Sequence, residues 1–245
     1  MRLSLAGVFA DAGAMWRNHR DILSAIAGVF FVVPILGILL LMAQGGLPTD
    51  PDPLKLNEAV RKFYEDNLLS FLLANLMIDF GTFAVFVLFL FPGERTLGET
   101  LLLSLKRLVP FIAVDLIAAI LFGIGISLFV LPGLLIFGRT WLAAPALAAN
   151  PELGMLGAFR QGWQRSDRLR WMMLIGAGAV TVIAALFLIL LGSALLGLLG
   201  AALGNSQILE AAGYVLIAFV GGIAWVTMAL IRVAAYRRTE PSIGI

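Results

Sequence analysis

The sequence predicts an all-α, polytopic membrane protein with six transmembrane helices, and three observations support this fold class. Hydrophobic residues make up 61% of the 245 residues and charged residues only 13%, whereas soluble domains are about 45–50% apolar and about 25% charged. The mean hydropathy is +1.00, and a chain this short has no core large enough to hide so much apolar surface from water. Long apolar runs also recur along the chain, and basic residues gather at alternate connections between them.

Six apolar runs are separated by clusters of proline, glycine and asparagine, which end helices. Pro34 lies inside the first run and is expected to kink it, and Pro132-Gly133 is expected to form a very short turn. The loop at about 43–67 is the longest polar excursion, with Asp52 as the expected cap of a short amphipathic helix. The whole chain, 1–245, is expected to form one integral membrane domain, with spans at about 22–42, 68–91, 110–131, 134–149, 171–199 and 208–231.

An amphipathic segment precedes each pair of spans, at about 3–19, 96–108 and 152–169. Thr96 and Glu99 have the spacing of a capping box, and Asn150 followed by Pro151 is typical of a helix start. These helices are expected to lie at the membrane surface. The order suggests three amphipathic-helix-plus-hairpin pseudo-repeats, although any protein with an even number of spans and basic inner loops has the same order.

The distribution of basic residues predicts the orientation. With the N-terminus inside, thirteen of the 17 lysines and arginines fall in inner segments, three in the outer loop (Lys55, Arg61 and Lys62), and Arg139 falls within a span. Since basic residues accumulate on the cytoplasmic side, both termini are expected to be cytoplasmic. The expected location is therefore a bacterial inner membrane, crossed several times.

Several kinds of chemistry find no support in the sequence. There is no cysteine and a single histidine, His19, which excludes disulfides, thiolate metal sites and a cysteine nucleophile. The carboxylates are not clustered, so no metal or cofactor is expected, and no serine has a positioned histidine, so no enzyme is expected. Basic residues lie beside the spans rather than on a soluble domain, so the expected partners are membrane lipids or another membrane protein, and not nucleic acid.

Three ionisable residues lie well inside the predicted spans: Asp79, Asp115 and Arg139. Each costs a few kcal/mol at the bilayer centre unless it is paired or hydrated. We expect Asp79 and Arg139 to form a buried pair that fixes helix packing. The alternative is a polar cavity that serves transport or binds an anionic head group.

A second charged group lies at the expected cytoplasmic interface. Arginine and tryptophan side chains together suit anionic lipid head groups, although basic residues that only anchor the topology would look the same. The candidate head-group contacts are Arg160, Trp163, Arg165, Arg168, Arg170 and Trp171.

The stretch Leu131 to Trp171 contains a Pro-Gly turn, a short span with Arg139, the small-residue stretch Ala143 to Pro145, and an amphipathic segment with Ser166. In these features it resembles the glycerophosphoryl diester phosphodiesterase membrane domain family. The resemblance covers about 40 residues well, and it departs from the family pattern at Asn150-Pro151-Glu152. It implies a membrane module without the soluble phosphodiesterase domain that some members carry.

Three functional hypotheses follow. The first is a non-enzymatic inner-membrane module that interacts with lipid or a partner protein. The second is a small transporter or lipid-translocating protein with a polar site around Asp79, Asp115 and Arg139, which a hydrated cavity at these residues would favour. The third is a membrane enzyme of lipid metabolism, which a cluster of Ser, Asp and Arg between Arg160 and Trp171 would favour.

Overall fold

The computed structural model describes residues 4–45, 53–93, 96–167, 170–203 and 207–239. Within these ranges every regular element is helical, so the predicted all-α class is confirmed. Six helical segments are long and apolar enough to cross a membrane, which confirms the predicted number of spans: Arg20–Gly45, Leu68–Leu90, Leu108–Leu128, Val130–Ala149, Arg170–Ala202 and Gln207–Arg238.

The first span contains a π-helical turn directly before its proline. Because Pro34 has no N–H and its ring displaces the carbonyl four residues earlier, a regular α-helix is disfavoured there, and the N–H of Val33 instead donates to the carbonyl of Gly28. The expected distortion is therefore a π-turn. The elements of this part are α1 (Leu5–Asn18), α2 (Arg20–Ala27), the π-helix η1 (Gly28–Val32), α3 (Val33–Gly45), α4 (Pro53–Asp66) and α5 (Leu68–Leu90). The expected cap at Asp52 lies outside the described residues.

The capping box at the start of α6 (Leu97–Lys106) forms as predicted. The Glu99 N–H donates to Thr96 Oγ1 at 3.3 Å, and the Thr96 N–H donates to Glu99 Oε2 at 2.9 Å. These bonds satisfy two N–H groups that have no partner inside the helix.

The turn between the third and fourth spans lies at Phe129, not at Pro132-Gly133 as predicted. Phe129 is extended between α7 (Leu108–Leu128) and α8 (Val130–Thr140). Pro132 lies in the first turn of α8, where a missing N–H costs no helical hydrogen bond. Gly133 belongs to the helix contact itself, since a Cβ on Gly125 would lie 2.8 Å from its Cα. The helix α9 (Ala143–Ala149) then continues the fourth span.

Asn150 stands at the N-cap position of a short 3-10 helix that begins with Pro151, as predicted, but the expected side-chain cap does not form. Its side chain makes no capping bond but donates to Tyr236 Oη at 2.9 Å and to Gln161 Oε1 at 3.3 Å. A long-range polar contact thus replaces the local one. The third part of the chain consists of the 3-10 helix η2 (Pro151–Leu153), α10 (Gly154–Arg165), α11 (Arg170–Leu203) and α12 (Gln207–Arg238).

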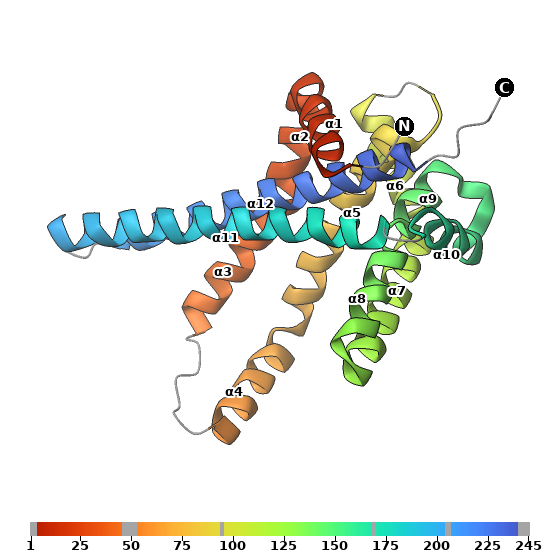
Figure 1. Ribbon diagram of the computed structural model, residues 1–245. Coiled ribbons are helices and arrows are strands. Elements are labelled where there is room, and N and C mark those ends of the chain that lie inside the picture. The colour runs from red at the N-terminus through yellow and green to blue at the C-terminus, as the bar shows by residue number, and fades with distance from the viewer. Residues whose placement is uncertain (1–3, 46–52, 94–95, 168–169, 204–206, 240–245) are drawn as a thin grey trace.

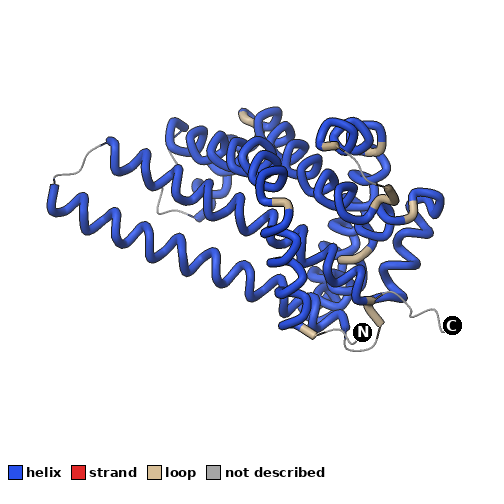
Figure 2. The backbone as a smooth tube through the Cα atoms, turned by 90° about the horizontal axis from the view of Figure 1, so that it is seen from above, coloured by secondary structure: helices blue, strands red, loops and turns tan. Residues whose placement is uncertain are grey.

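The order of elements follows the three predicted units, but the units are arranged differently in space. Figure 1 shows α1, α6 and the C-terminal end of α12 on one side of the molecule and α4 on the other. The α11–α12 hairpin lies crosswise to α3, α5 and α7–α8, and it projects from the rest of the molecule in Figure 2. Helix α12 packs against α1, η1, α3 and α5 and thereby connects the units.

A group of fully buried side chains lies where α9 and the last turns of α12 meet α5 and α10. Tyr236 is fully buried there, the Arg165 guanidinium lies 3.9 Å from the centroid of its ring, and its hydroxyl donates to Gln161. In contrast, α11 leaves large apolar side chains such as Ile183 and Phe187 about two-thirds exposed. Apolar surface of this kind suits contact with acyl chains.

An ion pair ties the first helix to the last. Arg238 Nη2 donates to Asp11 Oδ1 at 2.9 Å, and its Nε donates to the other carboxylate oxygen. This hydrogen bonding to Arg238 holds the pKa of Asp11 below its ordinary value of 3.8. The buried face of α1, formed by Val8, Ala12 and Met15, is thus held by both apolar packing and charge.

Candidate functional site

A cavity of about 640 Å³ lies among α5, α7, α8, α9, α11 and α12. Each long helix contributes one face to its wall, because side chains three and four residues apart lie on the same side of a helix. On α11 this face consists of Ile175, Gly178, Ala179, Thr181 and Val182. The wall is mostly apolar, and the volume lies in the range of small-molecule sites, about 300–1,000 Å³.

In the described part of the chain, three charged side chains line this cavity: Asp79, Asp115 and Arg232. Asp79 lies at the middle of α5, eleven residues from either end, which is about 16 Å along the helix. Asp115 lies seven residues into α7 and Arg232 six residues before the end of α12, about 10 Å and 9 Å along those helices. All three charged side chains therefore lie more than one and a half helical turns from the nearest end of their helix.

The two carboxylates have no direct partner within the described part of the chain. No hydrogen bond or ion pair reaches Asp79 or Asp115 there, and Arg232 lies beyond ion-pair distance, 4.0 Å, of both. Arg232 is instead held by the wall: its Nε donates to the Trp141 carbonyl at 3.1 Å, and its guanidinium lies 4.8 Å from the centre of the Phe86 ring.

The hydroxyl groups of the cavity wall donate to their own helices. Thr82, Thr140 and Thr181 each donate to the carbonyl four residues earlier, at 2.9–3.0 Å. The charged side chains are therefore the principal polar groups that the wall offers to a ligand.

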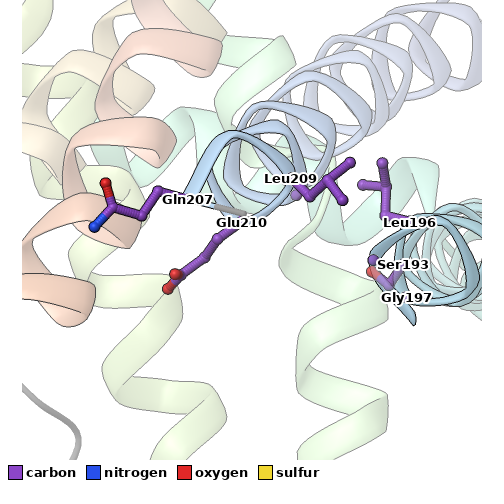
Figure 3. A pocket seen from close by; sticks show the side chains of 8 residues that line it. Ser193, Leu196, Gly197, Gln207, Leu209 and Glu210 are labelled. Carbon is purple, nitrogen blue, oxygen red and sulfur yellow. The ribbon is translucent and has the colours of Figure 1, made fainter. Parts of the chain in front are cut away.

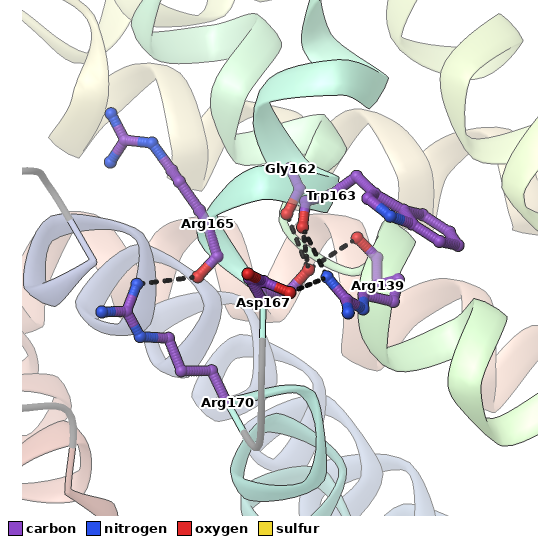
Figure 4. A network of polar contacts seen from close by, with 7 residues as sticks. Arg139, Gly162, Trp163, Arg165, Asp167 and Arg170 are labelled. Atoms are coloured by element: carbon purple, nitrogen blue, oxygen red, sulfur yellow. Dashed lines mark hydrogen bonds and ion pairs between the residues drawn. The ribbon is translucent and has the colours of Figure 1, made fainter.

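Arg139 does not belong to this cavity, and the predicted Asp79–Arg139 pair is wrong. Arg139 Nη1 lies 2.9 Å from Asp167 Oδ1 and donates to the Trp163 carbonyl at 3.2 Å, as Figure 4 shows. The reason is that α8 ends one residue after Arg139 and α10 packs against it. The arginine therefore lies at the helix end, close to residues that follow the span.

Sequence reasoning missed Arg232, because the last span was expected to end at Ile231. Helix α12 continues to Arg238, and the residues after Arg232 include the fully buried Val233, Ala234 and Ala235. The apolar residues that follow Arg232 were the sequence signal that could have placed this arginine inside the span. An arginine followed by buried alanines lies within a packed segment rather than at its exposed end.

The candidate head-group residues divide into two groups. Arg165 bonds within the protein rather than facing a lipid head group: its Nη1 donates to the Tyr236 carbonyl at 3.0 Å. Arg170 donates to the Arg165 carbonyl at 3.4 Å, and Trp171 packs against Gly138. Arg160 and Trp163 are exposed on α10, and Arg168 lies outside the described residues.

Ser, Asp and Arg side chains do meet in this region, the arrangement named above as favouring an enzyme. Ser166 is fully buried, and its hydroxyl lies within hydrogen-bonding distance of the Arg139 carbonyl (3.0 Å) and the Gly162 carbonyl (2.7 Å). Asp167 is the ion-pair partner of Arg139. In this arrangement Ser166 and Asp167 hold α8 against α10.

A second hollow, of about 470 Å³, lies at the tip of the α11–α12 hairpin. Figure 3 shows Leu196 and Leu209 pointing toward one another, while Gln207 and Glu210 project to the other side of α12. Glu210 accepts a hydrogen bond from the Tyr214 hydroxyl at 2.8 Å. No basic residue lines this hollow among the described residues, and Glu210 is its one charged residue there, so it offers fewer charged groups than the cavity at Asp79.

Within the described ranges no three histidine or acidic side chains gather in a way that could hold a metal ion.

Comparison with known proteins finds no match for this chain among family models, curated proteins or solved structures.

Proposed function

We propose that this protein binds an amphipathic, lipid-like molecule in the cavity at Asp79, Asp115 and Arg232, and that it acts as a small transporter or lipid-translocating protein. The observation that carries the proposal is a ligand-sized, largely apolar cavity with three charged side chains in its wall. Ionisable residues inside a membrane protein are costly, and they usually mark a substrate or ion pathway.

Two further observations support this proposal. Exposed apolar side chains on α11, including Ile183 and Phe187, leave that helix suited to contact with lipid, from which an amphipathic ligand would come. The charged groups lie about 9 Å to about 16 Å from the nearest ends of their helices, so a ligand that reaches them would bring its polar group among the packed helices.

The proposal includes a bacterial inner-membrane location with cytoplasmic termini. Two observations support it: the excess of basic residues in the inner segments, and the position of α1, α6 and the C-terminal end of α12 on one side of the molecule (Figure 1). The resemblance of Leu131 to Trp171 to the glycerophosphoryl diester phosphodiesterase membrane domain family stays a hypothesis. Exposed Arg160 and Trp163 on α10 are proposed to contact lipid head groups.

Two alanines of α11 provide a matched test. Ala179 lines the cavity and Ala184 does not, and both are exposed, so neither is expected to be needed for folding. Ala179→Phe should fill part of the cavity, whereas Ala184→Phe should only add apolar surface. The measurement is mass spectrometry of the amphipathic molecules that co-purify with each variant in mild detergent.

We expect a molecule that co-purifies with the wild type and with Ala184→Phe, and that is lost from Ala179→Phe. Equal recovery from all three proteins would refute binding in this cavity. For a ligand found in this way, movement across proteoliposome membranes should be slowed by Ala179→Phe and unchanged by Ala184→Phe; equal rates would refute a role in translocation.

A further inference from the structure

The charge balance of the cavity identifies the sign of its ligand. Among the described residues, two carboxylates, Asp79 and Asp115, line the same cavity as one guanidinium, Arg232, so their ionised forms together carry one negative charge in excess. An anionic head group would meet two like charges for each opposite one. A ligand with one positive charge would instead neutralise the site.

The position of Arg232 leaves the carboxylates available. Its Nε is bonded to the Trp141 carbonyl and its plane lies over Phe86, so the wall of the cavity holds the guanidinium. It lies beyond ion-pair distance of both aspartates. A carboxylate in an apolar environment is stabilised strongly by an opposite charge at contact distance. Among the described residues no opposite charge lies at that distance from Asp79 or Asp115, so a ligand can supply it.

The aromatic side chains of the wall also suit a cation. Five of them line the cavity, and three form a continuous row in which Phe137 is 5.5 Å from Phe122 and 6.1 Å from Trp141, measured between ring centroids. The faces of aromatic rings attract cations and are the usual walls of sites for substituted ammonium groups. The other two rings are Phe111 and Trp225.

We infer that the ligand of this cavity is a lipophilic cation: an apolar body that carries one amine or other positively charged group. Asp79 and Asp115 accept the cationic group, the aromatic side chains surround it, and the apolar wall of α7, α8 and α11 takes the body. This inference rests on the proposed function, because it names the ligand class of the same cavity.

A pair of probes with the same shape and opposite charge tests the inference. Tetraphenylphosphonium and tetraphenylborate are both compact apolar ions. The binding of each ion is measured by equilibrium dialysis against the protein in nanodiscs. Binding that remains with the Ala179→Phe variant is taken as partition into lipid and is subtracted. We expect at least about tenfold tighter cavity binding of the phosphonium, and a loss of at least about tenfold with Asp79→Asn or Asp115→Asn.

Asp21→Asn is the matched control, since this aspartate on α2 has a side chain that is 96% exposed and lies outside the cavity. It should bind the phosphonium like the wild type. Thermal melting of each variant confirms that it is folded, and because Asn has the shape of Asp, both cavity variants are expected to fold.

The outcomes separate this inference from the proposed function. Equal or tighter cavity binding of tetraphenylborate overturns the cationic class, and so does phosphonium binding that neither aspartate variant weakens. If Ala179→Phe reduces the binding of neither probe, the cationic ligand class is also overturned. The proposed function then depends on the co-purification experiment, which makes no assumption about ligand charge.

Discussion

Replacement of Arg139 by glutamine is expected to loosen the junction of α8 and α10, because its guanidinium makes three interactions there. It pairs with Asp167 Oδ1 at 2.9 Å, donates to the Trp163 carbonyl at 3.2 Å, and lies 5.3 Å from the Trp163 ring centroid. A hydrogen bond from a charged group is worth about 1.5–3 kcal/mol, and a cation–π contact at an accessible site about 0.5–1 kcal/mol. We expect Arg139→Gln to lower the free energy of unfolding by about 2–3 kcal/mol.

Asp167→Asn should cost less, because the Asp167 side chain is 60% exposed whereas that of Arg139 is 17% exposed. Solvent screening limits such a pair to about 1 kcal/mol or less. In a double-mutant cycle, Arg139→Gln and Asp167→Asn should therefore show a coupling free energy near that limit. Arg139→Gln and Asp79→Asn, which share no contact, should add within about 0.5 kcal/mol.

The assay is equilibrium unfolding of purified protein in mixed micelles of SDS and a mild detergent, followed by helical circular dichroism. If Arg139 instead paired with Asp79, as the sequence predicts, the coupling free energy would lie between those two residues and not between Arg139 and Asp167. A coupling above about 1 kcal/mol between those two residues, with none between Arg139 and Asp167, would refute the placement of Arg139 at the α10 junction.

Three further changes have expected outcomes in the same assays. Gly162→Ala should lower the free energy of unfolding by about 1–3 kcal/mol, since the new Cβ would lie 2.7 Å from the α9 backbone. Gly176→Ala is the control: no atom lies within 4 Å of its new Cβ, so it should be neutral or slightly stabilising. Equal melting temperatures of the two variants would contradict this difference. Thr96→Ala should cost about 1 kcal/mol in denaturant unfolding through loss of the capping box, and no measurable loss would show that the cap contributes nothing. Asp11→Asn should lower the melting temperature at pH 7. Because the folded-state pKa of Asp11 is depressed by Arg238, the wild-type advantage is full above about pH 5 and disappears as the pH falls through that lowered pKa; a difference that grows toward low pH would contradict the ion pair.

Local sequence signals predicted the elements because their causes are local. The capping box at Thr96 needs only residues three apart, and it forms as expected. The six apolar runs give six spans, since each hides its backbone polar groups in its own helix. Predictions that needed a specific partner failed: Asn150 bonds Tyr236 rather than capping a helix, and the α7–α8 turn lies at Phe129.

The candidate site was predicted in part. Asp79 and Asp115 stand out in the sequence because a carboxylate inside an apolar run is rare and costly, and both line the cavity. Arg139 looked equivalent by the same criterion. Its helix ends one residue later, which moves the guanidinium to Asp167. Arg232 lies near several other arginines, so composition alone indicated a cytoplasmic anchor.

The sequence by itself determined that the protein is helical, that it has six membrane-spanning segments, and that two aspartates lie within them, because hydrophobicity and helix hydrogen bonding depend on residues close along the chain. Only the tertiary structure decided which charges share a cavity. Asp79, Asp115 and Arg232 lie on three helices that are far apart in sequence. Their meeting depends on the packing of α12 across the other units, which is determined by the summed contacts of many side chains and by no local pattern.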